Sequence, residues 1–387
     1  MRELKIIINE MKKLFNLKMI CLLFLGSIIF YELFISFEID YFPNGRPNLD
    51  VYNVTVQMLH DYGKEMDEVE FEQFKNQNEE KIRQTDDFLS QNVDFNNVSI
   101  YSYEDYIRVE EQSFFEQRNE AFETMKWDYL NRKEGTCFWE LQTMEWIIST
   151  YEGRDNYYFE GLNEQKFNKR VNEIIEHNAN ESILPSTIFN NYNDFIMYVG
   201  VCIAVGIMFM LTPLYLKDRT GKVEYLQYSS KHGRRLCKSK VIAGLMSAFI
   251  ITTVELLIYF IVYRGNQTSM FMESNINSAL NHSFWFDLTF FQYIVCTVIS
   301  IYMISIFVAL ISMFVSRKVN SYVTGIGALV PTVFIVCGLT AGVLLNFIFS
   351  IYWPKYLVFG IYVVFLVITV PCMVWMLRKE RVIDIKG

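Results

Sequence analysis

The chain has 387 residues, of which 52% are hydrophobic and 16% aromatic, and its formal net charge is −8. A soluble chain of this length would form two or three domains, but long apolar runs separated by basic clusters are typical of a polytopic membrane protein. The acidic residues are concentrated in one region, because residues 38–193 hold 32 Asp and Glu against 14 Lys and Arg. Composition therefore indicates a membrane protein that carries one large, acidic, soluble insertion.

The seven cysteines and four histidines indicate neither a disulfide framework nor a metal site. Five cysteines lie in apolar runs, Cys237 lies in a basic loop, and Cys137 is the one cysteine of the acidic region. A single cysteine cannot close a disulfide within that region, so we expect the insertion to depend on its own apolar core. The sequence has no HExxH or CxxC spacing, and we therefore expect no bound metal.

Residues 1–18 are basic, with five Lys and Arg against two Glu. Their spacing predicts a helix whose apolar face contains Leu4, Ile7, Met11, Leu14 and Phe15, and whose polar face contains Arg2, Lys5, Glu10, Lys12 and Lys13. Such a helix would lie on the cytoplasmic leaflet and lead into the first span. The alternative is a merely basic flank that orients this span.

The first apolar run, at about residues 17–37, is long enough to cross a bilayer. No small-x-small cleavage site follows it, so we expect an uncleaved anchor, with residues 1–37 forming the N-terminal helix and first span. Glu32 lies near the outer end of this run, where its carboxylate can reach the headgroups.

Residues 38–193 are predicted to form a mainly helical extracellular domain. Three groups of apolar residues each have the spacing of one helix: Val51, Val54, Met58, Leu59, Tyr62, Met66 and Val69; Ile107, Phe114, Phe115, Phe122, Met125 and Tyr129; and Phe167, Val171 and Ile174. Acid pairs such as Asp86 and Asp87 are adjacent in sequence and do not face each other on a helix. These pairs therefore indicate a solvated surface of a helix and argue against a pair of catalytic acids.

Residues 194–387 contain five more apolar runs, which begin at about residues 195, 241, 288 and 322 and, for the last run, after residue 356. Basic residues lie in the segments between alternate runs, so the positive-inside rule places both termini in the cytoplasm and residues 38–193 outside the cell membrane. We therefore predict an all-α membrane protein with six transmembrane helices and a helical domain inserted between spans 1 and 2. Pro213 predicts a kink near the inner end of the second span.

Two features of these spans are candidate functional positions. Glu255 is an acid inside the third span, and it either has a role in transport or makes a packed interhelical hydrogen bond. Gly338 and Gly342 in the fifth span have the small-xxx-small spacing that lets two helices approach closely, which suggests a packing or dimer face.

Residues 217–240 separate the second and third spans and hold eight Lys and Arg against two acids. Between Gly221 and Gly233, the side chains of Val223, Leu226 and Gln227 fall on one face of a short helix. A compact helix between two spans could receive force from a soluble partner. The alternative is an ordinary basic loop that only sets the topology.

Loop 217–240 resembles the cytoplasmic loop between spans two and three of six-span type-2 ABC transporter permeases, the membrane subunits of ABC exporters. The matching elements are Asp218-Arg219-Thr220-Gly221, the short helix Val223–Tyr228, the run Ser229-Ser230-Lys231-His232-Gly233-Arg234, and Lys240 at the start of the next span. Clostridial-type members with Ser-Ser-Lys-x-Gly-Arg are the most similar. The chain departs from the pattern at Asp218, where Glu is usual, and at Lys222, where a small polar residue is common.

The resemblance implies that a separate cytoplasmic ABC ATPase docks on this loop and on the N-terminal helix. The implied coupling residues are Asp218, Arg219, Gly221, Glu224, Leu226, Ser230, Gly233, Arg234 and Lys240. The chain has no GxxxxGK[ST] loop, so ATP would be bound by the partner and no cofactor by this chain. The resemblance also implies a dimer with a second permease copy or a paralogue, through spans one and five.

The main functional hypothesis is therefore a permease that exports an amphipathic or hydrophobic peptide, antibiotic or lipid, with resistance to an antimicrobial peptide as one outcome. An alternative is a sensor or immunity protein whose ectodomain binds an external peptide and signals without transport. Ion-coupled transport through Glu255 is a third hypothesis, and a membrane enzyme is disfavoured because no nucleophile–base pair is evident. The basic residues are accounted for by the membrane surface, so we expect lipid contact and no nucleic acid partner.

Overall fold

The computed structural model describes residues 2–115, 119–130, 135–156, 164–221 and 236–382, together with Val223 and Gly233. Regular structure in these ranges consists of helices, which confirms the predicted all-α class. The chain divides into two compact units. The membrane unit comprises Met1–Tyr41, Asn190–Gln267 and Phe291–Gly387, and the insertion unit comprises Phe42–Phe189 and Thr268–Phe290.

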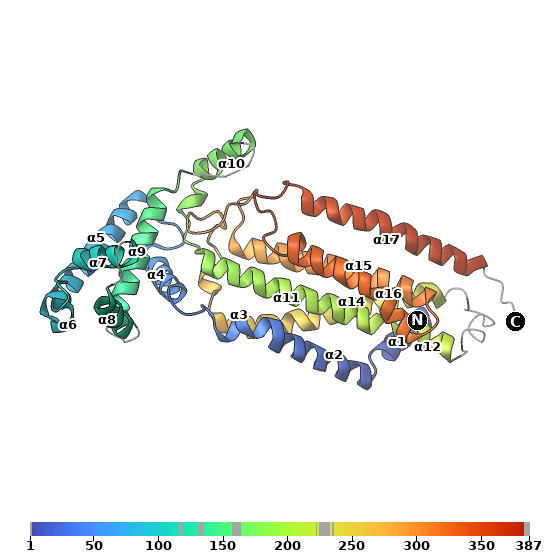
Figure 1. Ribbon diagram of the computed structural model, residues 1–387. Coiled ribbons are helices and arrows are strands. Elements are labelled where there is room, and N and C mark those ends of the chain that lie inside the picture. Colours follow the sequence, from blue (N-terminus) through green and yellow to red (C-terminus); the bar gives the residue numbers. More distant parts are fainter. Residues whose placement is uncertain are drawn as a thin grey trace. The chain divides into compact units, whose positions relative to one another are not determined.

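Six helical segments in the described ranges are long and apolar enough to cross a membrane, as predicted (Figure 1). In chain order they are built from α2 (Leu17–Phe30), η1 (Tyr31–Ile35) and α3 (Ser36–Asp40); α11 (Ser186–Leu211) and α12 (Pro213–Thr220); α14 (Leu236–Tyr263); α15 (Phe290–Lys318); α16 (Tyr322–Leu339) and η7 (Thr340–Leu344); and α17 (Leu357–Val382). Each has at least the roughly 20 residues that a helix needs to cross about 30 Å of hydrocarbon, at about 1.5 Å per residue.

Pro213 marks a break in the second span, as expected from its missing N–H. Helix α11 ends at Leu211, and Pro213 occupies the first turn of α12. The hydroxyl of Ser316 on α15 spans the break, because it donates to the carbonyl of Thr212 (2.6 Å) and accepts from the N–H of Tyr215 (3.1 Å). A side chain of a neighbouring span thus satisfies the backbone groups at the break, as the absence of water in a bilayer requires.

The first span is anchored near its C-terminal end by an amide of the second span and by an amide just after α14. Asn191 donates to the carbonyl of Glu38 (2.8 Å) and to its carboxylate (2.9 Å), and Asn266 donates to the same carbonyl (2.8 Å). The hydroxyl of Tyr263 donates to Asn191 (3.1 Å). This network holds α3 against α11 and α14.

The insertion unit contains α4 (Asn48–Tyr62), α5 (Glu68–Gln91), α6 (Val93–Asn96), α7 (Tyr103–Phe115), α8 (Glu120–Leu130), α9 (Thr136–Glu152) and α10 (Glu164–Glu176). Its apolar residues form two clusters, one around Phe71 and Ile147 and one around Phe95 and Phe138. The predicted third helix is confirmed as α10, in which Ile174 is fully buried.

The other two predicted helices of the insertion are each divided. Gly63 ends α4 with φ +87° and ψ −156°, a conformation open to glycine, and Asp67 then caps α5 in a capping box with Glu70. The expectation of one helix from Val51 to Val69 is therefore wrong. The second group falls on α7 and α8, because the side chain of Asn119 accepts from the N–H of Phe122 and starts a new helix there.

Residues 268–290, which join the third and fourth spans, belong to the insertion unit. Leu280 belongs to the cluster around Phe71, and its carbonyl accepts from the N–H of Ser186 (2.8 Å). The buried guanidinium of Arg170 on α10 binds Asp287 through two nitrogens (2.5 and 3.1 Å) and the carbonyl of Phe284 (2.9 Å). A bidentate pair of this kind fixes the segment against α10.

Candidate functional site

Helix α1 (Arg2–Leu14) packs against α12 and the first turns of α14 (Figure 1). Asn16 separates it from the first span, because its side chain accepts from the N–H of Met19 (3.2 Å) and caps α2. Leu14 and Glu10 are buried in this contact, whereas Leu4 is 56% exposed. The N-terminal helix is therefore held by the two elements that flank loop 217–240.

Four charged side chains meet where these helices touch, and we call them the four-charge cluster: Glu10 and Lys13 of α1, Asp218 of α12 and Lys240 of α14. The Lys13 ammonium lies 2.7 Å from the Glu10 carboxylate and 3.4 Å from that of Asp218. Lys240 donates a hydrogen bond to Asp218 and lies 4.0 Å from Glu10. Glu10, Asp218 and Lys240 are 4%, 7% and 3% exposed.

Charges buried this deeply need partners, because the loss of hydration is otherwise uncompensated. Burial lowers the pKa of Lys13, but hydrogen bonds and attraction to Glu10 and Asp218 outweigh it, and the net pKa is raised. The four-charge cluster therefore acts as an ionic link between the N-terminal helix and both ends of loop 217–240.

Two further cations tie α12 to its surroundings. The Lys217 ammonium donates to the carbonyl of Lys13 (3.0 Å) at the C-terminal end of α1, where a cation is favoured. The Arg219 guanidinium donates to the carbonyls of Arg317 (2.7 Å) and Val319 (2.6 Å), at the end of α15. A planar guanidinium can bridge several carbonyls at once, so α12 is joined to α1, α14 and α15.

Of the predicted coupling residues in the described part of the loop, Asp218 and Lys240 pair with each other, whereas Arg219 binds the end of α15. Asp218, Arg219 and Lys240 make contacts within the chain. Gly221 ends α12, and Gly233 is buried. The remaining predicted coupling residues lie outside the described residues; they are Glu224, Leu226, Ser230 and Arg234.

Sequence reasoning assigned the N-terminal helix to the docking site but missed the ionic contacts of Glu10 and Lys13 with Lys240 and Asp218. Glu10 was placed on the polar face of the helix, and this is wrong, because it is buried on the same side as Leu14. The signal was present in the spacing, since Glu10 lies three residues after Ile7 and four before Leu14.

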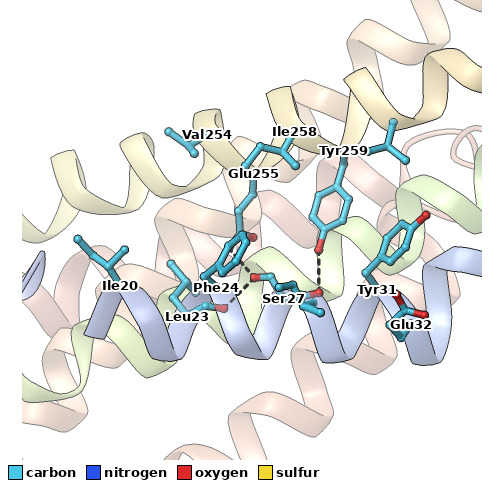
Figure 2. Close-up of a pocket in the computed structure, with 12 residues that line it drawn as sticks. Ile20, Leu23, Phe24, Ser27, Tyr31, Glu32, Val254, Glu255, Ile258 and Tyr259 are labelled. Carbon is cyan, nitrogen blue, oxygen red and sulfur yellow. Dashed lines mark hydrogen bonds between the residues drawn. The ribbon is translucent and has the colours of Figure 1, made fainter. Parts of the chain in front are cut away.

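Glu255 lies on the side of α14 that faces α2, and it is 6% exposed (Figure 2). The hydroxyl of Ser27 on α2 lies 3.2 Å from one of its carboxyl oxygens and 3.0 Å from the carbonyl of Leu23, so one proton is shared between two acceptors. The interhelical hydrogen bond considered from sequence is therefore present. The second oxygen, Oε2, has no hydrogen-bond partner among the described residues.

Gly338 and Gly342 face open space in the part of the chain that the structure describes, because a Cβ added to either would meet no atom within 4 Å. By contrast, a Cβ at Gly200 would collide with Leu345, so that glycine permits close packing of α11 within the chain. The face of the fifth span that carries Gly338 and Gly342 is therefore open to another helix.

No group of three or more His, Cys, Asp or Glu side chains within the described ranges is placed to hold a metal ion. The chain matches no protein-family model, no curated protein and no solved structure.

Proposed function

We propose that the chain is the membrane-spanning permease subunit of an ABC-type transporter, which exports an amphipathic or hydrophobic substrate. A separate cytoplasmic ATPase would dock on loop 217–240 and supply the energy. The observation that carries this proposal is the four-charge cluster, which links α1, α12 and the start of α14.

The mechanism follows from this connection. A push on the loop would act on α12, which Arg219 and Lys217 hold to α15 and α1, and on α14, which Lys240 holds to the same cluster. The movement would pass to the second and third spans as rigid bodies, with nucleotide biasing two arrangements of the helices. A second copy or a paralogue would complete the pathway, and the open face of Gly338 and Gly342 is a candidate contact for it.

The same proposal places both termini and loop 217–240 in the cytoplasm and residues 38–193 outside. Its support is the bias of Lys and Arg toward the segments assigned to the inside. Single cysteines in a background without native cysteines test this with an impermeant maleimide. Val93→Cys, on an exposed residue of the insertion unit, is expected to react on intact cells, and Lys12→Cys only after permeabilisation.

Docking is tested by purifying the tagged chain from its own membranes and measuring ATP hydrolysis by whatever protein accompanies it. Gly233→Trp combined with Arg234→Glu is expected to remove that activity. Arg264→Glu combined with Gly265→Trp is the matched control, because it makes the same exchanges after the third span, where a Cβ on Gly265 would meet no described atom within 4 Å. Equal accompanying ATP hydrolysis in both variants would contradict the docking site.

The sensor hypothesis makes a different prediction for the same preparation. A transporter reconstituted with its ATPase moves an amphipathic compound into or out of vesicles only when ATP is hydrolysed. A sensor binds its external peptide and shows no such movement, so ATP-dependent flux separates the two functions.

A further inference from the structure

A pocket of about 340 Å³ lies on the membrane unit between the first and third spans. Its walls come from α2, η1 and α14, as Figure 2 shows, and most of its lining side chains are apolar. Phe24, Val254 and Ile258 form part of its rim and are 61%, 49% and 49% exposed. Because these residues lie on apolar spans, the pocket opens toward the region that hydrocarbon would occupy.

The ionisable side chains that line this pocket include acids and no bases. Its twelve lining residues include the acids Glu32 and Glu255 and no Lys, Arg or His. Glu255 is 94% buried, its Oε1 shares the proton of Ser27, and its Oε2 lacks a hydrogen-bond partner among the described residues. A buried carboxyl oxygen left without a donor is unfavourable, which makes it the feature of the pocket that a ligand would complete.

We propose that this pocket binds an amphipathic amine, with its hydrocarbon part along the apolar walls and its ammonium group at Glu255. An alkyl amine, like a lysine side chain, carries a positive charge at neutral pH. Its N–H groups supply the donor that Oε2 lacks, in a charge-assisted hydrogen bond.

Other occupants fit less well. A lipid acyl chain would fill the apolar walls but would leave Oε2 without a donor. An ionised fatty acid or an anionic phosphate group has no N–H to offer Oε2, and the described pocket lining holds no Lys, Arg or His to pair with it. The volume lies within the roughly 300–1,000 Å³ that is usual for small-molecule sites, which suits a single alkyl chain or a drug-sized amine.

This inference does not depend on the proposed transport function, because binding is a property of the chain alone. It can therefore be tested on the purified full-length protein in lipid nanodiscs without an ATPase. A failure to bind amines would leave the docking proposal standing, and a failure of docking would leave the amine site standing.

The probe is a dodecylamine that carries a photoreactive diazirine, and the labelled peptides are identified by mass spectrometry. Labelling is expected in residues 20–32 and 254–262, and excess dodecylamine should prevent it whereas excess dodecanoic acid should not. Glu255→Gln is expected to weaken binding by about 10-fold or more, as loss of a charge-assisted hydrogen bond would.

A second variant keeps the test valid if Glu255→Gln does not fold. Val254→Trp fills the rim without removing the carboxyl group, and Leu257→Trp is its matched control, because Leu257 is 59% exposed on the same helix and does not line the pocket. Labelling should be lost in the first and kept in the second. The proposal is overturned if dodecanol or dodecanoic acid competes as well as dodecylamine, or if both Trp variants label equally.

Discussion

Replacing Lys240 with methionine tests whether the four-charge cluster holds α1 in place. The substitution keeps most of the side-chain volume and removes one charge. Asp218 loses the buried hydrogen bond that Lys240 donates to it. Glu10 loses the ammonium group that lies 4.0 Å from its carboxylate. Breaking a buried ion pair by removing one partner costs about 3–5 kcal/mol.

The cost should appear as local opening of α1, because this helix contributes two of the four charges. A loss of about 3 kcal/mol in the free energy of opening corresponds to roughly 100-fold faster amide exchange. Hydrogen exchange of residues 8–14 in the purified protein measures this directly. Lys238→Met is the matched control, because Lys238 is exposed on the same helix, and its effect should stay below about 0.5 kcal/mol.

A double variant separates a lost ion pair from general damage. Asp218→Leu combined with Lys240→Met removes both partners and leaves Glu10 paired with Lys13 at 2.7 Å. Replacing a buried pair by apolar residues is often close to neutral, so exchange in α1 should return to within about 10-fold of the unaltered protein. Unchanged exchange in Lys240→Met, or equally fast exchange in the double variant, would refute the reasoning.

Three further outcomes are expected. Gly63→Ala should lower the stability of the insertion unit by about 1–3 kcal/mol, measured by thermal unfolding, because φ +87° with ψ −156° is unfavourable for any residue with a Cβ. Burial raises the pKa of Asp287. The hydrogen bonds from Arg170 and His177 lower this pKa by more than burial raises it, so the net pKa is depressed. The stabilisation is present above the ordinary pKa of about 4 and is lost as the pH falls through the folded value, so Asp287→Asn should flatten the acid dependence of hydrogen exchange in residues 270–288. Gly338→Ile should leave folding intact and reduce self-association, counted by single-molecule photobleaching.

The spans could be predicted from sequence because a single local property decides them. A run of about 20 apolar residues buries itself in hydrocarbon whatever its neighbours are. The break at Pro213 was predictable for the same reason, since a missing N–H is local. The turn at Gly63 and the capping box of Asp67 and Glu70 carried an equally local signal, which the apolar spacing around them concealed.

The features that could not be predicted from sequence are contacts between segments far apart in the chain. Nothing in the pattern of residues 268–290 indicates that Leu280 joins a cluster with Phe71, or that Asp287 pairs with Arg170. Glu10 and Asp218 lie 208 positions apart, and their meeting at Lys240 depends on how α1 packs against α14. The unpaired oxygen of Glu255 likewise became visible once Ser27 was placed beside it.

The most direct test of ATP-driven coupling is to place a photo-cross-linking amino acid at Leu226 and, separately, at Tyr101, which is 54% exposed in the insertion unit. Both full-length variants are irradiated in the membranes of the native cell, and the products are identified by mass spectrometry. The proposal predicts that Leu226 cross-links to a nucleotide-binding ATPase and that Tyr101 does not. A cross-link to that ATPase from Tyr101, or none from Leu226, would contradict it.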